Sequence, residues 1–181
     1  MAEKNLTGKK ILVVIARKDF RDEEYFIPLE IWQKAGAEII TASSKIGTVI
    51  GVLGGEAEAV LDIKNAKAKN FDAVIFVGGS GSAEYFKSKD AHRIAKEFNE
   101  AKKTIGAICI APVILAKAEI LQGKTATVWY DNMDKTGPNA LREGGCFLSG
   151  NSVEETGNII TGNGRQASEE FAEAIARHLG K

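Results

Sequence analysis

The stretch Thr104-Ile-Gly-Ala-Ile-Cys109-Ile-Ala-Pro112 decides the fold. Its first six residues form a short apolar run, which is typical of a strand covered on both faces of a sheet. Pro112 stands three residues after Cys109, and proline is favoured in the first turn of a helix because that turn needs no N–H. Small glycine and alanine residues around the cysteine allow a sharp turn. The stretch therefore predicts a buried strand, a nucleophile elbow at Cys109 and a helix.

Similar apolar runs lie on both sides of this stretch and alternate with helical patterns. The runs predict strands over residues 11–16, 38–42, 71–77, 104–109 and 124–129, with late short strands at 146–148 and 159–161. The patterns between them predict helices over 22–35, 90–102 and 168–179, with Asp90 as the cap of the second. One further helix starts at Pro112, and another ends at Glu143. A short helical piece is expected at 63–69, and a hairpin-like excursion over 45–62. Such alternation predicts parallel pairing through right-handed crossovers. The expected architecture is α/β, an open doubly wound sheet with helices on both faces.

Composition narrows the class of protein. The 181 residues suit one domain, 1–181, because domains usually span roughly 100–200 residues. Lys plus Arg and Asp plus Glu both number 24, so the net charge is zero, which argues against a nucleic-acid partner or an acidic membrane surface. Two cysteines are too few for a disulfide framework. Met1–Lys10 is polar and lacks a secretion signal, so we expect a cytoplasmic protein.

Four loops are expected at one edge of the sheet. They are residues 17–22, 78–82, 110–111 and 129–132, and each follows a predicted strand or opens a helix. In open α/β sheets, ligands bind outside the carboxyl ends of the strands. The sequence therefore predicts that these four loops meet around one site.

Cys109 has two interpretations. Its sulfur is expected near a helix N-terminus, where unpaired N–H groups and the helix dipole favour a thiolate, so that the residue acts as a nucleophile. Alternatively, Cys109 is a buried structural cysteine, because free cysteine packs as a small hydrophobe. Cys146, the second cysteine, opens a late strand and is interpreted as a packing residue.

Glu24 is the predicted partner of this cysteine. It shares a helix face with Ile27, Pro28 and Ile31, whereas Glu23 belongs to a mixed, more solvated face. Burial would raise the pKa of the Glu24 carboxyl and leave a protonated acid able to donate a hydrogen bond to a thiolate. The alternative is a glutamate that reaches solvent at the start of the helix, where the dipole favours it.

The loop Gly78-Gly79-Ser80-Gly81 admits three roles. It is a weak match to a phosphate cradle, because it lacks the third glycine of the dinucleotide-binding fingerprint G-x-G-x-x-G and does not follow the first strand of the fold. Its N–H groups suit an oxyanion hole that faces Cys109, and a plain tight turn is the remaining alternative. His92 and His178 are the only histidines, and neither is expected to serve as base. No metal-ligand spacing is present, so we expect neither metal nor cofactor.

Four motifs together resemble the ThiJ/PfpI superfamily, in chain order from Ile11 to the closing helix. They are the spacing of Glu24 to Pro28, Val74-Ile-Phe-Val-Gly-Gly79, Ala107-Ile-Cys-Ile-Ala-Pro112, and Gly157-Asn-Ile-Ile-Thr-Gly-Asn-Gly164. The resemblance implies a flavodoxin-like, mostly parallel sheet related to class I glutamine amidotransferases. It also implies that members commonly form homodimers or higher homo-oligomers, with shared sites in the peptidase-like branch.

The resemblance assigns roles to particular residues. Cys109 maps to the nucleophile, Glu24 to its partner acid, and the backbone N–H groups of Gly79 and Ile110 to the oxyanion site, with Gly78 and Trp129 expected along the pocket. The peptidase-like branch carries His directly after the nucleophile, where this chain has Ile110, and the deglycase-like branch carries His near 128–129, where this chain has Val-Trp. Both familiar bases are missing, and this weighs against peptide hydrolysis, which needs a proton donor for its leaving group.

Three functions follow from these residues. The first is a cysteine-dependent enzyme of the glyoxalase or deglycase kind, which adds its thiolate to small reactive carbonyls such as methylglyoxal. The second is a cysteine-based sensor or protective protein in oxidative stress, without turnover, whose oxidised Cys109 is held by Glu24. The third is an intracellular cysteine peptidase acting on peptides.

Overall fold

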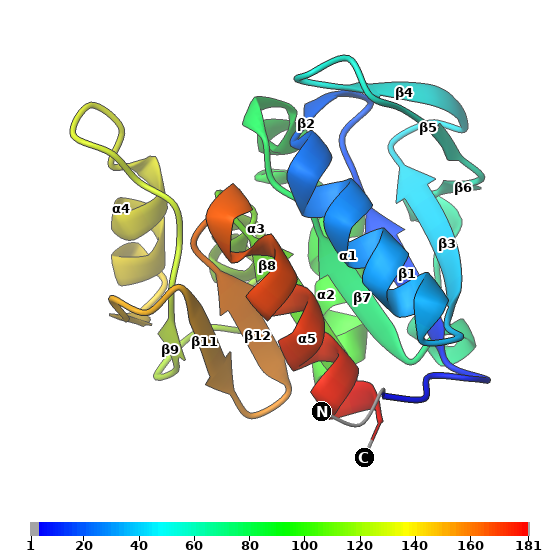
Figure 1. Ribbon diagram of the computed structural model, residues 1–181. Helices are drawn as coiled ribbons and strands as arrows, with labels where there is room; N and C mark the ends of the chain where they lie inside the picture. Colours follow the sequence, from blue (N-terminus) through cyan, green and yellow to red (C-terminus); the bar gives the residue numbers. More distant parts are fainter. Residues whose placement is uncertain (1–3, 181) are drawn as a thin grey trace.

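The computed structural model describes residues 4–180, and its centre is a seven-stranded sheet (Figure 1). The strands lie in the order β11-β12-β8-β7-β1-β3-β6, and all neighbours pair parallel except β11 and β12. Their bounds are β1 Lys10–Val14, β3 Glu38–Ser43, β6 Leu61–Asp62, β7 Ala73–Phe76, β8 Thr104–Ile108, β11 Val153–Thr156 and β12 Ile159–Gly162. The predicted α/β, doubly wound and mostly parallel architecture is confirmed.

Helices cover both faces of the sheet because its central strands are apolar on both sides. All residues of β7 and β8 are buried. On one face α1 (Asp22–Lys34) packs against α5 (Ser168–Leu179), and α2 (Lys89–Glu100) and α3 (Pro112–Lys117) cover the other (Figure 1). The indole Nε1 of Trp32 donates to the carbonyl of Ala172 at 2.9 Å and links α1 to α5. These layers hold the start of α1 and the end of β8 in fixed positions.

A second, three-stranded sheet lies beside the start of α1. It contains β2 (Lys18–Phe20), β4 (Gly47–Gly51) and β5 (Glu56–Ala59), and β4 and β5 form the hairpin expected within residues 45–62. The carboxylate of Asp22 accepts backbone N–H bonds from Leu53 and Gly55, both at 2.8 Å. The hairpin is thereby tied to the first turn of α1.

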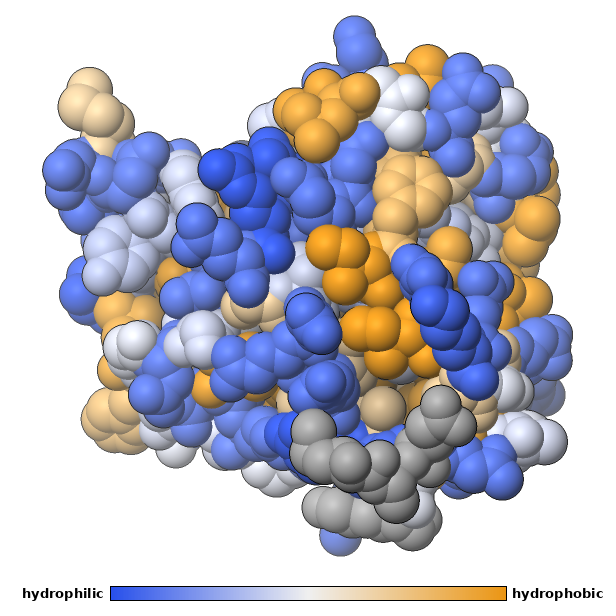
Figure 2. Space-filling view, viewed as in Figure 1, coloured by the Kyte–Doolittle hydropathy of each residue, from blue (hydrophilic) through white to orange (hydrophobic). Residues whose placement is uncertain are grey.

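Exposed apolar side chains gather over this hairpin and over α1, as Figure 2 shows. They include Ile27, Ile50 and Leu53, the last of which is 64% exposed. Apolar groups that lie together on a surface often mark an interface. Assembly of the chain with copies of itself stays a prediction, and this face is where it can be tested.

The 124–164 segment departs most from expectation. The strand predicted over 124–129 is reduced to β9 (Thr125–Ala126), which pairs with β10 (Phe147–Leu148) outside the main sheet, and α4 (Thr136–Glu143) lies beside them. Trp129 donates its N–H to the carbonyl of Cys109 rather than to a continuing strand. β11 was not predicted, because its sequence Val-Glu-Glu-Thr is polar and it lies at the sheet edge.

Smaller corrections concern helix ends and turns. Residues 63–69 form two 3₁₀ turns, η1 (Ile63–Asn65) and η2 (Ala68–Asn70), instead of one helical piece, and η3 (Ser80–Tyr85) occupies part of the glycine-rich loop. The cap of α2 is Ser88, whose Oγ accepts from the N–H of Ala91 at 3.2 Å, and not Asp90. In the described part of the chain, no helix is both long and apolar enough to cross a bilayer.

Candidate active site

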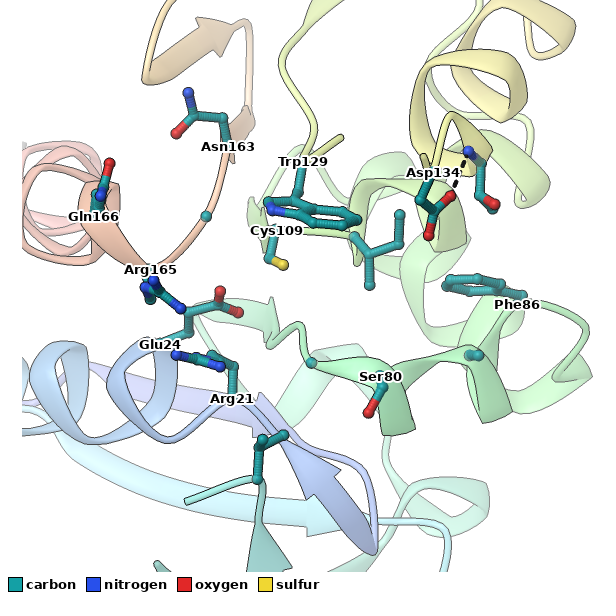
Figure 3. A pocket seen from close by; sticks show the side chains of 16 residues that line it. Arg21, Glu24, Ser80, Phe86, Cys109, Trp129, Asp134, Asn163, Arg165 and Gln166 are labelled. Carbon is teal, nitrogen blue, oxygen red and sulfur yellow. Dashed lines mark hydrogen bonds between the residues drawn. The ribbon is translucent and has the colours of Figure 1, made fainter. Parts of the chain in front are cut away.

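A pocket of about 770 Å³ lies at the carboxyl ends of the central strands (Figure 3). All four loops expected at this edge contribute to its surroundings: Arg21, Gly79, Ile110 and Trp129 line it. A fifth loop, residues 163–166 after β12, also lines the pocket and was not anticipated. The topology accounts for the meeting of these loops, because the parallel strands all end at this edge.

Cys109 occupies a tight turn directly after β8. Its φ is 64°, in the left-handed region that residues other than glycine rarely adopt. Hydrogen bonds hold both of its peptide groups: its N–H donates to the carbonyl of Gly162 at 2.9 Å, and its carbonyl accepts from the N–H of Trp129 at 2.8 Å. The turn therefore has the geometry of a nucleophile elbow, and it directs the sulfur into the pocket (Figure 3).

Glu24 lies beside this sulfur, at the bottom of the pocket. Its side chain is 1% exposed, its Oε2 accepts the N–H of Gly78 at 3.0 Å, and Oε1 is buried without a hydrogen-bond partner in the described residues. The Glu24 carboxyl and the Cys109 thiol lie close enough that each shifts the pKa of the other, and both lie against the Cα of Gly78. Glu24 is therefore buried beside Cys109, as predicted, and does not reach solvent at the start of the helix.

Gly78 lies behind this pair and makes their approach possible. A Cβ atom there would lie 2.5 Å from the Cys109 Cβ and 2.6 Å from Glu24 Oε2. The N–H of Gly78 holds Glu24, and its carbonyl accepts the N–H of Arg21 at 3.0 Å. The first N–H of the glycine loop is thus committed to holding the carboxyl, which argues against the phosphate-cradle interpretation of this loop.

Burial sets the protonation of the pair. It raises the pKa of Glu24 from its usual 4.5 to about 7, against the opposing effect of the neighbouring Cys109 thiol. Burial also raises the pKa of the Cys109 thiol to about 12, and the Glu24 carboxylate adds to this. The sequence predicts a thiolate at this helix N-terminus, whereas burial of the sulfur favours the neutral thiol in the resting site. The resting pair is a thiol beside a carboxyl that changes charge near neutral pH.

Backbone donors surround the sulfur. The N–H groups of Gly79 and Ile110 lie near the sulfur and favour its negatively charged form, which lowers the pKa of the Cys109 thiol against the effect of burial. Gly79 has a φ of 98°, which glycine adopts without strain, and a Cβ there would lie 2.5 Å from the backbone of Arg21 and of Asp19. Gly79 and Ile110 both line the pocket. These two N–H groups are thus placed where they can stabilise negative charge on the sulfur or on an oxygen bound beside it.

Several polar residues of the pocket were missed from the sequence. They are Arg21, Asp134, Asn163, Arg165 and Gln166. The available signal was positional: a loop that follows a strand and contains Gly164, at the same sheet edge as Cys109. His92 does not line the pocket, and its Nε2 lies 3.0 Å from the carbonyl of Phe86. Cys146 is 6% exposed and lies in the core.

Comparison with known proteins identifies the family. The profile of the DJ-1/PfpI family matches residues 9–178, and this chain belongs to that family. MJ0967 of Methanocaldococcus jannaschii, named an uncharacterized protein, is 36% identical over 87% of this chain and 76% of its own. Protein/nucleic acid deglycase 2 of Escherichia coli is 31% identical over 66% of this chain and 70% of its own.

The fold comparison agrees with the sequence comparison. The crystal structure of a ThiJ/PfpI domain protein from Brachyspira murdochii superposes with a TM-score of 0.89 at 34% identity, covering 95% of this chain and 98% of that one. The predicted membership of the ThiJ/PfpI superfamily is therefore confirmed.

Proposed function

We propose that this protein is a cysteine-dependent enzyme that acts on reactive carbonyls, in the manner of a glyoxalase or a deglycase. The observation that carries the proposal is that the Cys109 thiol and a buried carboxyl, Glu24, lie side by side in one pocket, and that the pKa of this carboxyl is about 7. The relative named as a deglycase supports the same class of substrate. A general base with a pKa near the working pH is effective in proton transfer.

The first chemical step is addition of the sulfur to an aldehyde. The Glu24 carboxylate takes the thiol proton while Cys109 Sγ forms a bond to the carbonyl carbon. The electron pair of the C=O bond moves to oxygen, where the N–H groups of Gly79 and Ile110 lie ready to stabilise it. Glu24 then returns its proton to that oxygen, giving a hemithioacetal. No free thiolate is required before attack, so the raised pKa of Cys109 is compatible with this step.

With methylglyoxal, the same carboxylate can complete an isomerisation. It removes the proton from the former aldehyde carbon and returns it to the neighbouring carbon, while the hydroxyl proton passes from the former aldehyde oxygen to the neighbouring oxygen. The hemithioacetal thereby becomes a lactoyl thioester. Water hydrolyses the thioester, releasing lactate and the thiol. The overall reaction consumes one methylglyoxal and one water, and it needs no oxidant.

Lactate formation tests this proposal. We expect wild-type protein to produce lactate from methylglyoxal and Cys109→Ser to produce none above the uncatalysed rate. Cys146→Ser is the matched control, because that cysteine lies in the core and should not affect turnover. Equal rates for wild type and Cys109→Ser would refute the proposal.

A second function is favoured by the unpartnered Oε1 of Glu24. We propose that peroxide oxidises Cys109 first to sulfenic and then to sulfinic acid, each step consuming one peroxide and releasing one water. The protonated Oε1 would donate to a sulfinate oxygen. Mass spectrometry after mild peroxide should show two added oxygens on Cys109 and none on Cys146; an unmodified Cys109 would contradict the sensor role.

Peptidase activity has less support. Among the described residues, no histidine lines the pocket, and Ile110 occupies the position after the nucleophile. An amide leaving group needs a proton donor. Glu24, the carboxyl that lies beside the sulfur, is already needed for the attack. Cleavage of casein, lost in Cys109→Ala, would reverse this ranking.

A further inference from the structure

Arg165 brings into the pocket a positive charge that forms no salt bridge within the described chain. It is exposed and lines the same pocket as Cys109 and Glu24. Within residues 4–180, no carboxylate lies at salt-bridge distance from its guanidinium. Arg21, the other arginine of this pocket, is instead paired with Glu23, with Nε–Oε2 at 2.8 Å and Nη2–Oε1 at 3.0 Å. Only Arg165 keeps its charge available to a ligand.

The backbone fixes the position of Arg165 relative to the nucleophile. β12 pairs in parallel with β8, and the carbonyl of Gly162 accepts the N–H of Cys109. Arg165 follows three residues later. Between them, Gly164 has φ 146° and ψ −172°, a region that essentially only glycine occupies, and a Cβ there would lie 3.3 Å from Trp129 Cδ1. The loop is thus held against both chain segments that contact the elbow.

The charges around the pocket leave a positive side and a negative side. Arg21 and Glu23 offset each other, and Glu24 is committed to Cys109. Asp134 lies across the pocket from Arg165 (Figure 3), where its carboxylate accepts the N–H of Thr136 at 2.9 Å. Its negative charge disfavours anions on that far side.

The ligand chemistry that suits the Arg165 side is a carboxylate. A guanidinium presents two parallel N–H groups to a carboxylate, and this bidentate pairing is among the strong hydrogen bonds of proteins. The amides of Asn163 and Gln166 lie on the same loop and also line the pocket. With one unpaired cation present and Glu23 near it, a monoanion is better matched than a dianionic phosphate.

We propose that Arg165, with Asn163 and Gln166, forms a subsite for a carboxylate, and that the substrate is an α-oxoaldehyde whose far end carries that carboxylate. This inference rests on the proposed carbonyl chemistry and specifies its substrate. An example is 4,5-dioxopentanoate. The isomerisation described above, followed by hydrolysis with one water, would convert it to 2-hydroxyglutarate.

Turnover of two substrates gives the first test. We expect the ratio of kcat/KM for 4,5-dioxopentanoate to kcat/KM for methylglyoxal to fall about fivefold in Arg165→Gln, through a rise in KM, because one charge contact in water is worth roughly that factor. Arg177→Gln removes the same charge from the far end of α5 and should leave the ratio unchanged. An equal ratio in wild type and Arg165→Gln would overturn the subsite and leave the proposed function standing.

Alkylation of Cys109 gives a second test that needs no turnover. Iodoacetate and iodoacetamide differ in charge and react with the same thiolate, so the ratio of their rates cancels any change in the pKa of Cys109. Peptide mapping separates Cys109 from Cys146. We expect the iodoacetate-to-iodoacetamide ratio to fall about fivefold in Arg165→Gln and to be largely restored in Arg165→Lys. The same ratio in Arg165→Gln and Arg177→Gln would overturn the subsite.

The two tests fail in different ways. Absence of turnover with both aldehydes, together with an iodoacetate preference that depends on Arg165, would refute the proposed function and support the anion subsite. If Cys109 reacts with neither reagent, iodide quenching of Trp129 replaces alkylation, since Trp32 is 1% exposed and does not respond. Quenching that is equally strong in wild type and Arg165→Gln would then overturn the subsite.

Discussion

Glu23 and Glu24 are consecutive residues in the first turn of α1, but their surroundings differ. Glu24 lines the pocket, on what we call the dry wall, whereas Glu23 does not line it and faces the partly exposed side of the turn, the wet wall. On the dry wall, Glu24 is 1% exposed and burial raises its pKa to about 7. On the wet wall, Glu23 is paired with Arg21, and hydrogen bonds and nearby positive charge outweigh the partial burial and hold its pKa below the usual range. A rotation of one residue along a helix therefore separates the group that we propose transfers the proton from an ordinary ion pair.

The largest expected difference between the walls is in turnover. Glu24→Gln keeps the shape of the side chain but cannot accept the thiol proton, so we expect lactate formation to fall by about 100-fold or more. Glu23→Gln should change it by less than about threefold, because Glu23 does not line the pocket and partly exposed ion pairs have small effects. Initial rates with methylglyoxal measure both. Similar losses in the two variants would show that the dry wall has no special role in proton transfer.

The next effect is on stability as a function of pH. Glu24 has a folded pKa above its unfolded value of 4.5, so the folded protein binds more protons between pH 4.5 and about 7, and stability falls as pH rises through that window. The loss amounts to about 3 kcal/mol. Urea unfolding at pH 4.5 and pH 8 should show it for wild type. The difference in stability between wild type and Glu24→Gln should change by this amount between the two pH values, because the other carboxyls titrate alike in both proteins. A difference that does not change would contradict the assignment.

Gly78→Ala tests the packing of the dry wall. Its Cβ would lie within 2.8 Å of Cys109 Cβ, Glu24 Oε2 and the carbonyl oxygen of Ile108. Overpacking of this kind costs about 1–3 kcal/mol. Thermal or urea denaturation measures the loss. Gly123→Ala is a control for the effect of an added methyl group in open space, although its φ of 72° adds local strain of its own. If the Gly78→Ala variant were stable and fully active, the close packing of Cys109 against Glu24 would not be needed for stability or for activity.

The smallest effect belongs to the wet wall. Glu23→Gln should lower the free energy of unfolding at pH 7 by about 0.5 kcal/mol, as expected for a partly exposed ion pair. The sign with pH is opposite to that of Glu24: the contribution of Glu23 is present at neutral pH and is lost as the pH falls through its lowered folded pKa. Unfolding of wild type and Glu23→Gln at pH 3 should therefore converge. A difference that widens in acid would contradict this account.

The sequence predicts the parts of the site that depend on periodicity and strand ends. Glu24 was identified by its place in an apolar helical stripe, and Cys109 by its place between a buried strand and Pro112; both line the pocket. Arg165 was not identified, because an arginine in a loop has no periodicity and its proximity to Cys109 depends on the pairing of β12 with β8. The protonation of the pair also required the structure, because desolvation outweighs the helix N-terminus only at the observed burial. The catalytic roles, the absence of cofactors, the assembly state and a cytoplasmic location stay predictions.

The left-handed backbone at Cys109, with φ 64°, has a consequence for how this chain evolves. A residue other than glycine in that conformation costs about 1 kcal/mol or more, and glycine would relieve the strain. Selection for stability alone would therefore replace this cysteine by glycine. Where a cysteine persists at this position along a lineage, its reactivity is under selection, and drift to glycine would mark descendants that have kept the architecture and abandoned the chemistry.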